Sequence, residues 1–133
     1  MRVRSRVLAR WGIVLACAVP AAGCVAAAAA GAAGGIYATT RGVESLINGP
    51  VDQVAERVPA VMQQMDITQT GSSAADGGAK REFKGKHADL DVTVQLERQD
   101  SVTTKTEVYA RKNLAQWDKD YAREVLERLV QQR

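Results

Sequence analysis

The sequence is poor in the residues that build aromatic cores and chemical centres. Aromatic residues make up 5% of its 133 residues, and it has one histidine and two cysteines. A core made from this chain must therefore be mostly aliphatic. The length suits one small domain and excludes a multidomain enzyme or a long repeat array. Hydrophobic residues at 46% and charged residues at 25% are close to the averages of soluble globular proteins, which argues against wholesale disorder.

Acidic residues are absent from the N-terminal part of the chain, where the first one is Glu44. An apolar run extends from Trp11 to Val19, and small residues follow it. The basic residues that precede the run are Arg2, Arg4, Arg6 and Arg10. A basic start, an apolar stretch and small residues at its end are typical of a secretory signal peptide. We expect this signal to span residues 1–23.

The end of the signal, Ala21-Ala22-Gly23-Cys24, resembles a bacterial lipobox. The resemblance implies that the signal is cut before Cys24, that its thiol receives a diacylglycerol and that the new N-terminus is acylated. Val25 stands where an Asp commonly retains such lipoproteins at the inner membrane, so the resemblance implies the outer membrane, facing the periplasm. The expected partner of the N-terminus is thus the membrane, through this lipid.

Three other interpretations of the N-terminus stay open. Cleavage near Ala22 by the ordinary signal peptidase would give a soluble secreted protein. The apolar and small residues that continue to Ala38 are numerous enough to cross a bilayer without cleavage, although Pro20 and several glycines make this span weakly hydrophobic. An Arg-rich, acid-poor start is also found in mitochondrial presequences, but those are amphipathic and Ser-rich.

Cysteine usage has a chemical consequence if the lipobox is used. Cys17 is then discarded with the signal and Cys24 carries lipid, so the mature chain holds no free thiol. This excludes a disulfide framework, a thiol nucleophile and a Cys-based zinc site. We expect no cofactor and no metal site.

Low-complexity sequence separates the signal from the domain. We expect residues 24–39 to be a lipidated Ala/Gly-rich tether and residues 40–133 to be a small α+β domain. Alanine favours a helix and glycine opposes it, and no large side chain is available to pack. Gly31 and Gly35 also fit a small-xxx-small contact between membrane helices.

The first helix of the domain is predicted by apolar residues at helical spacing. They are Val51, Val54, Ala55, Val58, Met62 and Met65. Asn48 or Gly49 is the expected cap and Pro50 suits the first turn. Pro59 removes one backbone donor inside this run, so we expect a kink or two short helices. Met62 and Met65 are expected to fill the core.

Strands are predicted on both sides of a flexible loop. A short strand covers 43–47, a second short strand covers 67–70, and Gly71–Gly78 is expected to be the loop. A strand follows at 79–84 with Phe83 inward, and Gly85-Lys86 is expected to turn it. Strict alternation over 88–97 and 102–110 predicts a hairpin whose Leu90, Val92, Val94 and Leu96 face one way.

The C-terminal residues predict a second amphipathic helix, capped by Asp118 and with Asp120 near its start. Its apolar stripe is Tyr121, Ala122, Val125, Leu126, Leu129 and Val130. The predicted fold class is therefore α+β. We expect an antiparallel four-stranded sheet, in the order β-α-β-β-β-α along the chain, with two helices packed on one face.

The lipobox, the Ala/Gly tether, the Gly-containing first strand before Pro50-Val51, the long hairpin and the terminal helix together resemble a family of small bacterial lipoproteins. That family is known only as a domain of unknown function. The resemblance spans nearly the whole chain. The sequence departs from the family pattern at Pro59 and at Gln116-Trp117-Asp118, where a Gly-rich turn is expected. It implies a fold and a location, and it transfers no catalytic residue.

Candidate chemistry is sparse. On one strand His87, Asp89 and Asp91 would share a face, but that face is the solvated one, so we expect exposed polar residues and no metal. The basic stretch 80–87 suits an edge strand guarded by lysine, with anionic lipid headgroups or lipopolysaccharide as an alternative contact. A Gly-x-Ser-x-Gly nucleophile elbow is absent from the sequence.

These observations predict a non-enzymatic binding or structural component of the cell envelope, with the exposed sheet face as its first candidate surface and an envelope protein as a possible partner. The alternative is a lipid or small-molecule binding module that uses the groove between helices and sheet. Beyond Cys24 the chain has 14 basic and 15 acidic residues, a net side-chain charge of −1. Nucleic acid is therefore not an expected partner.

Overall fold

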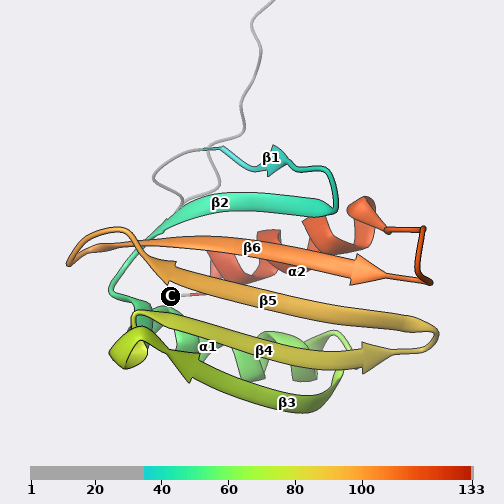
Figure 1. The fold of residues 1–133 in the computed structure, drawn as a ribbon, viewed down its shortest axis with the longest axis horizontal. Coiled ribbons are helices and arrows are strands. Elements are labelled where there is room, and N and C mark those ends of the chain that lie inside the picture. Colours follow the sequence, from blue (N-terminus) through green and yellow to red (C-terminus); the bar gives the residue numbers. More distant parts are fainter. Residues whose placement is uncertain (1–34, 133) are drawn as a thin grey trace, which may run out of the picture.

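A computed structural model describes residues 35–132 of the chain. The strands are β1 (Tyr37–Ala38), β2 (Gly42–Asn48), β3 (Thr68–Ala75), β4 (Lys80–His87), β5 (Leu90–Arg98) and β6 (Thr103–Arg111). The helices are α1 (Val51–Gln64), α2 (Lys119–Gln131) and the short 3-10 helix η1 (Asp76–Gly78). The six strands form one antiparallel sheet in the order β1-β2-β6-β5-β4-β3 (Figure 1).

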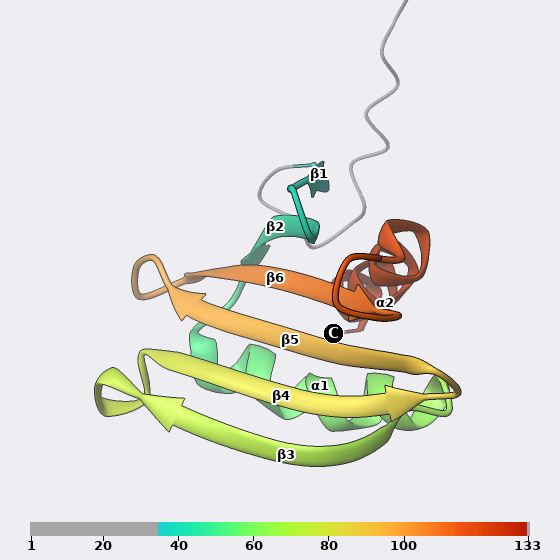
Figure 2. The ribbon, with the colours of Figure 1, turned by 45° about the vertical axis from the view of Figure 1, so that its right-hand side comes forward.

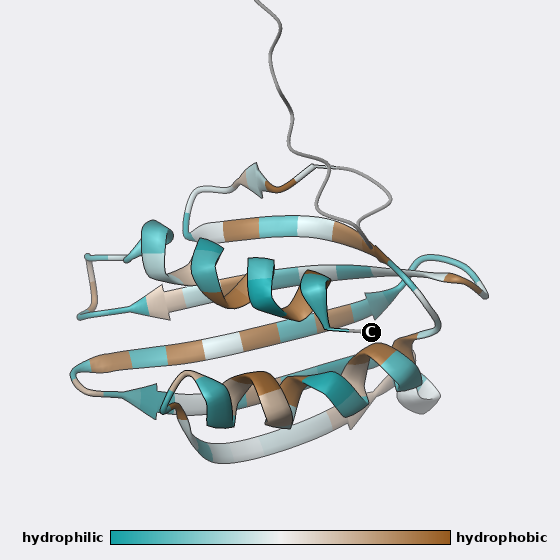
Figure 3. Cartoon of the chain, turned by 180° about the vertical axis from the view of Figure 1, so that it is seen from behind, coloured by the Kyte–Doolittle hydropathy of each residue, from teal (hydrophilic) through white to brown (hydrophobic). Residues whose placement is uncertain are grey.

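Both long helices cover the same face of this sheet (Figure 2). Helix α2 packs on β2 and β6, whereas α1 packs on β3, β4 and β5. Figure 3 shows the helices in front of the sheet and the alternation of hydrophilic and hydrophobic residues along the strands. One face of the sheet is therefore buried, and the other is left to solvent.

The core between helices and sheet is aliphatic, as the scarcity of aromatic residues predicts. Leu90, Val92, Val94 and Leu96 of β5 all point into it, which confirms the predicted alternation. Met62 and Met65 are buried there, and so is Phe83, the one aromatic residue among the buried apolar residues of the described part. Burial of these side chains is the main stabilising contribution, about 1.5–3 kcal/mol for each large aliphatic side chain.

The predicted four-stranded sheet is wrong, because the sheet has six strands, although the α+β class is consistent with the structure. The segment expected to be a loop, Gly71–Gly78, instead contains most of β3 and all of η1. Glycine, serine and alanine are weak strand formers, so the local sequence gives no strand signal there. The pairing of β3 with β4 overrides that weak preference. The other additional strand, β1, has two residues, which is too short for a sequence pattern.

The turn between β4 and β5 also differs from the prediction. Strand β4 continues past Gly85-Lys86 to His87, and the chain turns at Ala88-Asp89, between the paired residues His87 and Leu90. Ala88 adopts φ 50°, a conformation that glycine enters more readily than alanine. A two-residue hairpin turn with Ala in this position lacks the usual Asn-Gly or Gly-X signature, so the sequence does not reveal it.

Helix α1 runs through Pro59 as one helix, so the expected split into two short helices is wrong. Pro59 lies on the exposed side of the helix, while Val58 and Val61 on either side of it are buried in the core. Tertiary packing therefore holds the helix across the position where one backbone hydrogen bond is missing. The expected Asn48 or Gly49 cap is also wrong, since Pro50 occupies the cap position and makes no side-chain cap bond.

Helix α2 confirms its prediction. Asp118 is the N-cap, and its Oδ1 accepts a hydrogen bond of 2.8 Å from the backbone N–H of Tyr121. The predicted apolar stripe is buried from Ala122 to Val130. Arg128 and Glu124, four residues apart, form an ion pair with 3.4 Å between nitrogen and oxygen.

Truncation of a core side chain tests the packing of α2. Leu126 is fully buried and Leu114 is 93% exposed. We expect Leu126→Ala to lower the free energy of unfolding by about 2–5 kcal/mol because it leaves a cavity. The matched control Leu114→Ala should stay within about 0.5 kcal/mol of the wild type. Urea titration followed by circular dichroism measures both, and equal losses would contradict this placement of α2.

Two glycines test the close packing of strands. A Cβ added at Gly42 would lie 2.0 Å from the carbonyl oxygen of Val108, whereas one added at Gly71 would meet nothing within 4 Å. We expect Gly42→Ala to destabilise the protein by about 1–3 kcal/mol, because β2 must move away from β6. Gly71→Ala should be close to neutral in the same thermal melts. A Gly42→Ala variant as stable as the wild type would contradict the register of β2 on β6.

Candidate functional site

The face of the sheet opposite the helices is the candidate site. Among the described residues no helix or loop crosses its centre, and Figure 1 looks directly onto it. The inward positions of β5 and β6 are buried, so the pleat turns the intervening polar residues out to this face. The outward residues of the four central strands include Glu44, Lys80, Glu82, Lys84, Thr93, Gln95, Glu97, Lys105, Glu107 and Tyr109.

A chain of polar contacts crosses this face over three strands. Lys84 Nζ of β4 lies 2.9 Å from Glu82 Oε1. Gln95 of β5 donates from Nε2 to Glu82 Oε2 at 2.8 Å, and its Oε1 accepts from the Tyr109 hydroxyl of β6 at 3.2 Å. The Gln95 amide thus joins β4 to β6, and both of its ends have a partner. Lys84 and Gln95 together lower the pKa of the Glu82 carboxyl, which stays ionised.

Tyr109 stands at the end of this chain of contacts, and two side chains flank its ring. The Trp117 ring meets it edge to face at 6.1 Å between centroids, and the Arg41 guanidinium lies 5.9 Å from the centre of its ring. Partial burial, followed by hydrogen bonding with the neighbouring Glu107 carboxylate, raises the pKa of Tyr109 well above its usual value. The phenol is therefore a neutral donor, and its hydrogen bond goes to Gln95 Oε1.

A shallow hollow of about 320 Å³ lies beside this chain on the same face. Its lining consists of Ser73, Ala75, Lys80, Arg81, Glu82, Gln95, Leu96, Glu97, Lys105 and Glu107. Charges of both signs alternate across it: Lys105 pairs with Glu44 at 3.2 Å, and Lys80 pairs with Glu97 at 3.8 Å. Such a surface offers donors and acceptors of both signs to a polar partner.

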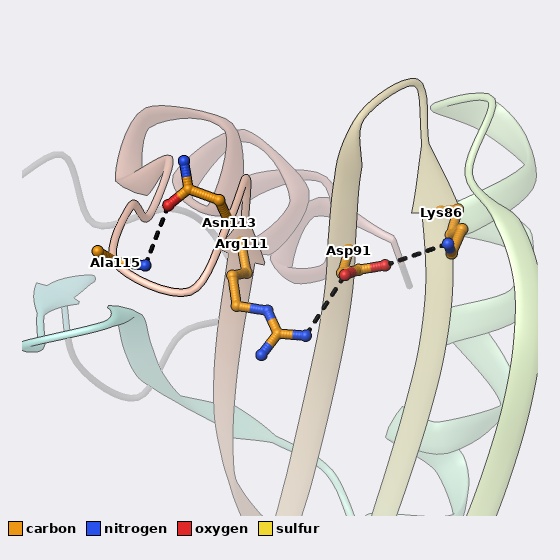
Figure 4. Close-up of polar contacts among 5 residues, drawn as sticks. All are labelled: Lys86, Asp91, Arg111, Asn113 and Ala115. Atoms are coloured by element: carbon orange, nitrogen blue, oxygen red, sulfur yellow. Dashed lines mark hydrogen bonds and ion pairs between the residues drawn. The ribbon is translucent and has the colours of Figure 1, made fainter.

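The same alternation continues at the end of the hairpin (Figure 4). Asp91 lies between Lys86, at 3.7 Å, and Arg111, at 3.4 Å, so that one carboxylate links three strands. Beyond Arg111 the chain turns through Asn113, whose Oδ1 accepts from the backbone N–H of Ala115 at 3.0 Å. This local bond shapes the loop that brings Trp117 back against β6.

The expected arrangement of His87, Asp89 and Asp91 on one strand is wrong. His87 ends β4, Asp89 lies in the turn and Asp91 lies in β5, so no single strand aligns them. The His87 ring stacks on Tyr121 of α2 at 5.0 Å, and its Nδ1 lies 3.2 Å from the carbonyl oxygen of Asp66. Within residues 35–132 no group of three or more His, Cys, Asp or Glu side chains is placed to hold a metal ion.

The basic stretch is also placed differently from its prediction. It lies on β4, which is paired on both sides, and not on an edge strand. Its charged side chains have acidic partners: Lys80 with Asp76, Arg81 with Asp52, Lys84 with Glu82 and Lys86 with Asp91. Cys24, the predicted lipid attachment residue, lies outside the described residues. No helix in the described part is long and apolar enough to cross a membrane.

No known family, curated protein or solved structure matches this chain. The site therefore stands on its own geometry. Sequence reasoning found the exposed sheet face but missed the chain of contacts from Glu82 through Gln95 to Tyr109. These residues lie on three strands, and only the register that opposes Glu82 to Gln95 brings them together. A polar residue at an outward strand position does not itself indicate which residue of the neighbouring strand it contacts.

The pH dependence of stability tests the surroundings of Tyr109. The folded protein holds the phenolic proton more tightly than the unfolded chain does, since the folded pKa is raised. Stability is therefore expected to fall as the pH rises above the ordinary tyrosine pKa of about 10. Tyr109→Phe should remove part of that fall. Urea titrations from neutral to alkaline pH measure it, and identical slopes for both proteins would contradict the buried phenol.

Proposed function

We propose that this protein is a bacterial lipoprotein, anchored through Cys24 to the outer membrane and facing the periplasm. Its domain would serve as a non-enzymatic binding or structural component of the cell envelope. The proposal includes the resemblance to the small lipoprotein family of unknown function. The proposed lipid anchor is supported by the acid-free start, the apolar run and the Ala-Ala-Gly-Cys sequence. The proposed binding or structural role of the domain is supported by the sheet face that no described helix covers.

The observation that supports a binding role is the ordered polar network on that face. Lys84, Glu82, Gln95 and Tyr109 are held by one another at hydrogen-bond distances, so their donors and acceptors are fixed before any partner arrives. Surface ion pairs contribute only about 0–1 kcal/mol each to stability. Their larger effect is to present a patterned polar surface, and such patterns give protein partners specificity.

The alternative role, a lipid or small-molecule module with its ligand between helices and sheet, receives less support. Val94, Leu96 and Val108 of the sheet are at most 1% exposed, and so are Val58 of α1 and Leu126 of α2. A ligand there would have to displace packed side chains. The described hollows lie on the outer face and beside the loop at Trp117.

The mature N-terminus tests the anchor directly. We expect mass spectrometry of the protein isolated from its host membranes to find a chain that begins at Cys24 and carries a diacylglycerol and an N-acyl group. An intact Met1, or a Cys24 without lipid, would reject the lipoprotein proposal.

Fractionation of cells supplies the mutational test of the same anchor. Cys24→Ala should move the protein out of the membrane fraction, because the lipid can no longer be attached. Cys17→Ala is the matched control, since that cysteine is expected to be removed with the signal. Retention of the Cys24→Ala variant in membranes would instead support an uncleaved membrane span.

Crosslinking in cells, followed by purification, separates the two roles of the domain. We expect reproducible protein partners from the wild type and from Glu56→Arg, a change on the exposed side of α1. Thr93→Arg should lose them, because it places a large cation in the middle of the sheet face. Co-purified lipid without protein partners would favour the ligand-binding role, and equal partner recovery from both variants would reject the sheet face.

A further inference from the structure

The far edge of the sheet is open. Strand β3 pairs with β4 on one side, and on its other side no strand of the described part lies against it (Figure 1). None of its eight residues is buried. The strand is therefore held by its hydrogen bonds to β4 and gains almost nothing from burial of its own side chains. Its outer backbone N–H and C=O groups form a template on which another strand can pair.

This edge lacks the usual protection against pairing. The sequence of β3, Thr-Gln-Thr-Gly-Ser-Ser-Ala-Ala, contains no charged residue and no proline. The opposite edge is closed by β1, whose two residues offer little to pair with. One bulge interrupts β3 between Gln69 and Gly71, so the irregularity is confined to one end. From Gly71 to Ala75 the register on β4 is continuous, which leaves five residues in regular geometry.

The side chains around this edge would not repel a second copy. Those from Gly71 to Ala75 are short on both faces, so another strand can approach to the usual spacing of about 4.8 Å. The cations on neighbouring β4 are already neutralised within the chain: Lys80 lies 3.3 Å from Asp76, Lys84 lies 2.9 Å from Glu82, and Arg81 pairs with Asp52 of α1. Two identical edges can thus meet without bringing unpaired like charges together.

We propose that β3 pairs with β3 of a second copy, antiparallel and about a twofold axis, and so joins two six-stranded sheets into one. A twofold interface requires a self-complementary surface, and an uncharged strand of small residues meets this requirement. A foreign strand is selected partly by charges on the strand that it joins, and β3 itself carries none. Ser73, in the middle of the regular segment, lies closest to the axis. The inference does not depend on the lipid anchor.

Opposite charges introduced at Ser73 in two variants of the full-length protein test the pairing. Sedimentation of purified wild type in detergent over a range of concentrations should show a reversible monomer–dimer equilibrium. Ser73→Lys and Ser73→Glu should each weaken the dimer by about tenfold or more, because like charges then oppose across the axis. Mixing the two variants should restore dimers. Ser101→Lys, the same change in the exposed turn between β5 and β6, should leave the dimer intact.

A second measurement separates loss of pairing from loss of folding. Circular dichroism should be unchanged in every variant, since Ser73 is exposed. In Ser73→Cys the two new thiols should be joined across the dimer by a short bismaleimide, whereas those of Ser101→Cys should not. A wild type that is monomeric at all concentrations overturns the proposal. So does an association that survives Ser73→Lys, or a mixture of the charge variants that stays monomeric.

Discussion

The structure depends on one constraint: the sheet buries one of its faces and leaves the other to water. Two amphipathic helices supply a single apolar layer, and the alternation of the strands divides each of them between that layer and solvent. Because aromatic residues are scarce, the buried layer is built from Val, Leu, Ile and Met, with Phe83 at its border. The outward side chains then face water or polar neighbours, since no second layer of the described part covers them.

The polar face and the open edge are two consequences of this arrangement. On the face, Gln95 finds partners on both adjacent strands, so Glu82, Gln95 and Tyr109 become one connected surface. At the edge, α1 contacts β3, but no residue of β3 is buried. The described chain enters the sheet at β1, on the opposite edge.

The sequence predicted the elements that the core determines. Leu90 to Leu96 alternate because one side of β5 is buried, and Asp118 caps α2 because its carboxylate can accept from the N–H of Tyr121. The sequence predicted only the start of β3, as a short strand over 67–70, and missed the part from Gly71 to Ala75, whose Gly, Ser and Ala residues take a strand conformation through pairing with β4. It could not predict the turn at Ala88 either, or the contact of Gln95 with Tyr109. Each of these depends on the register between strands, which local patterns leave open.

The division of the sheet into a buried face and a free face can be measured along β5 alone. Single cysteines at Val92, Thr93, Val94 and Gln95 in the purified full-length protein, with the wild type as the background for Cys17 and Cys24, would be exposed to a water-soluble thiol reagent. The account predicts fast labelling at Thr93 and Gln95, and labelling at Val92 and Val94 only after unfolding. Equal rates at all four positions, or slow labelling at Thr93, would contradict it.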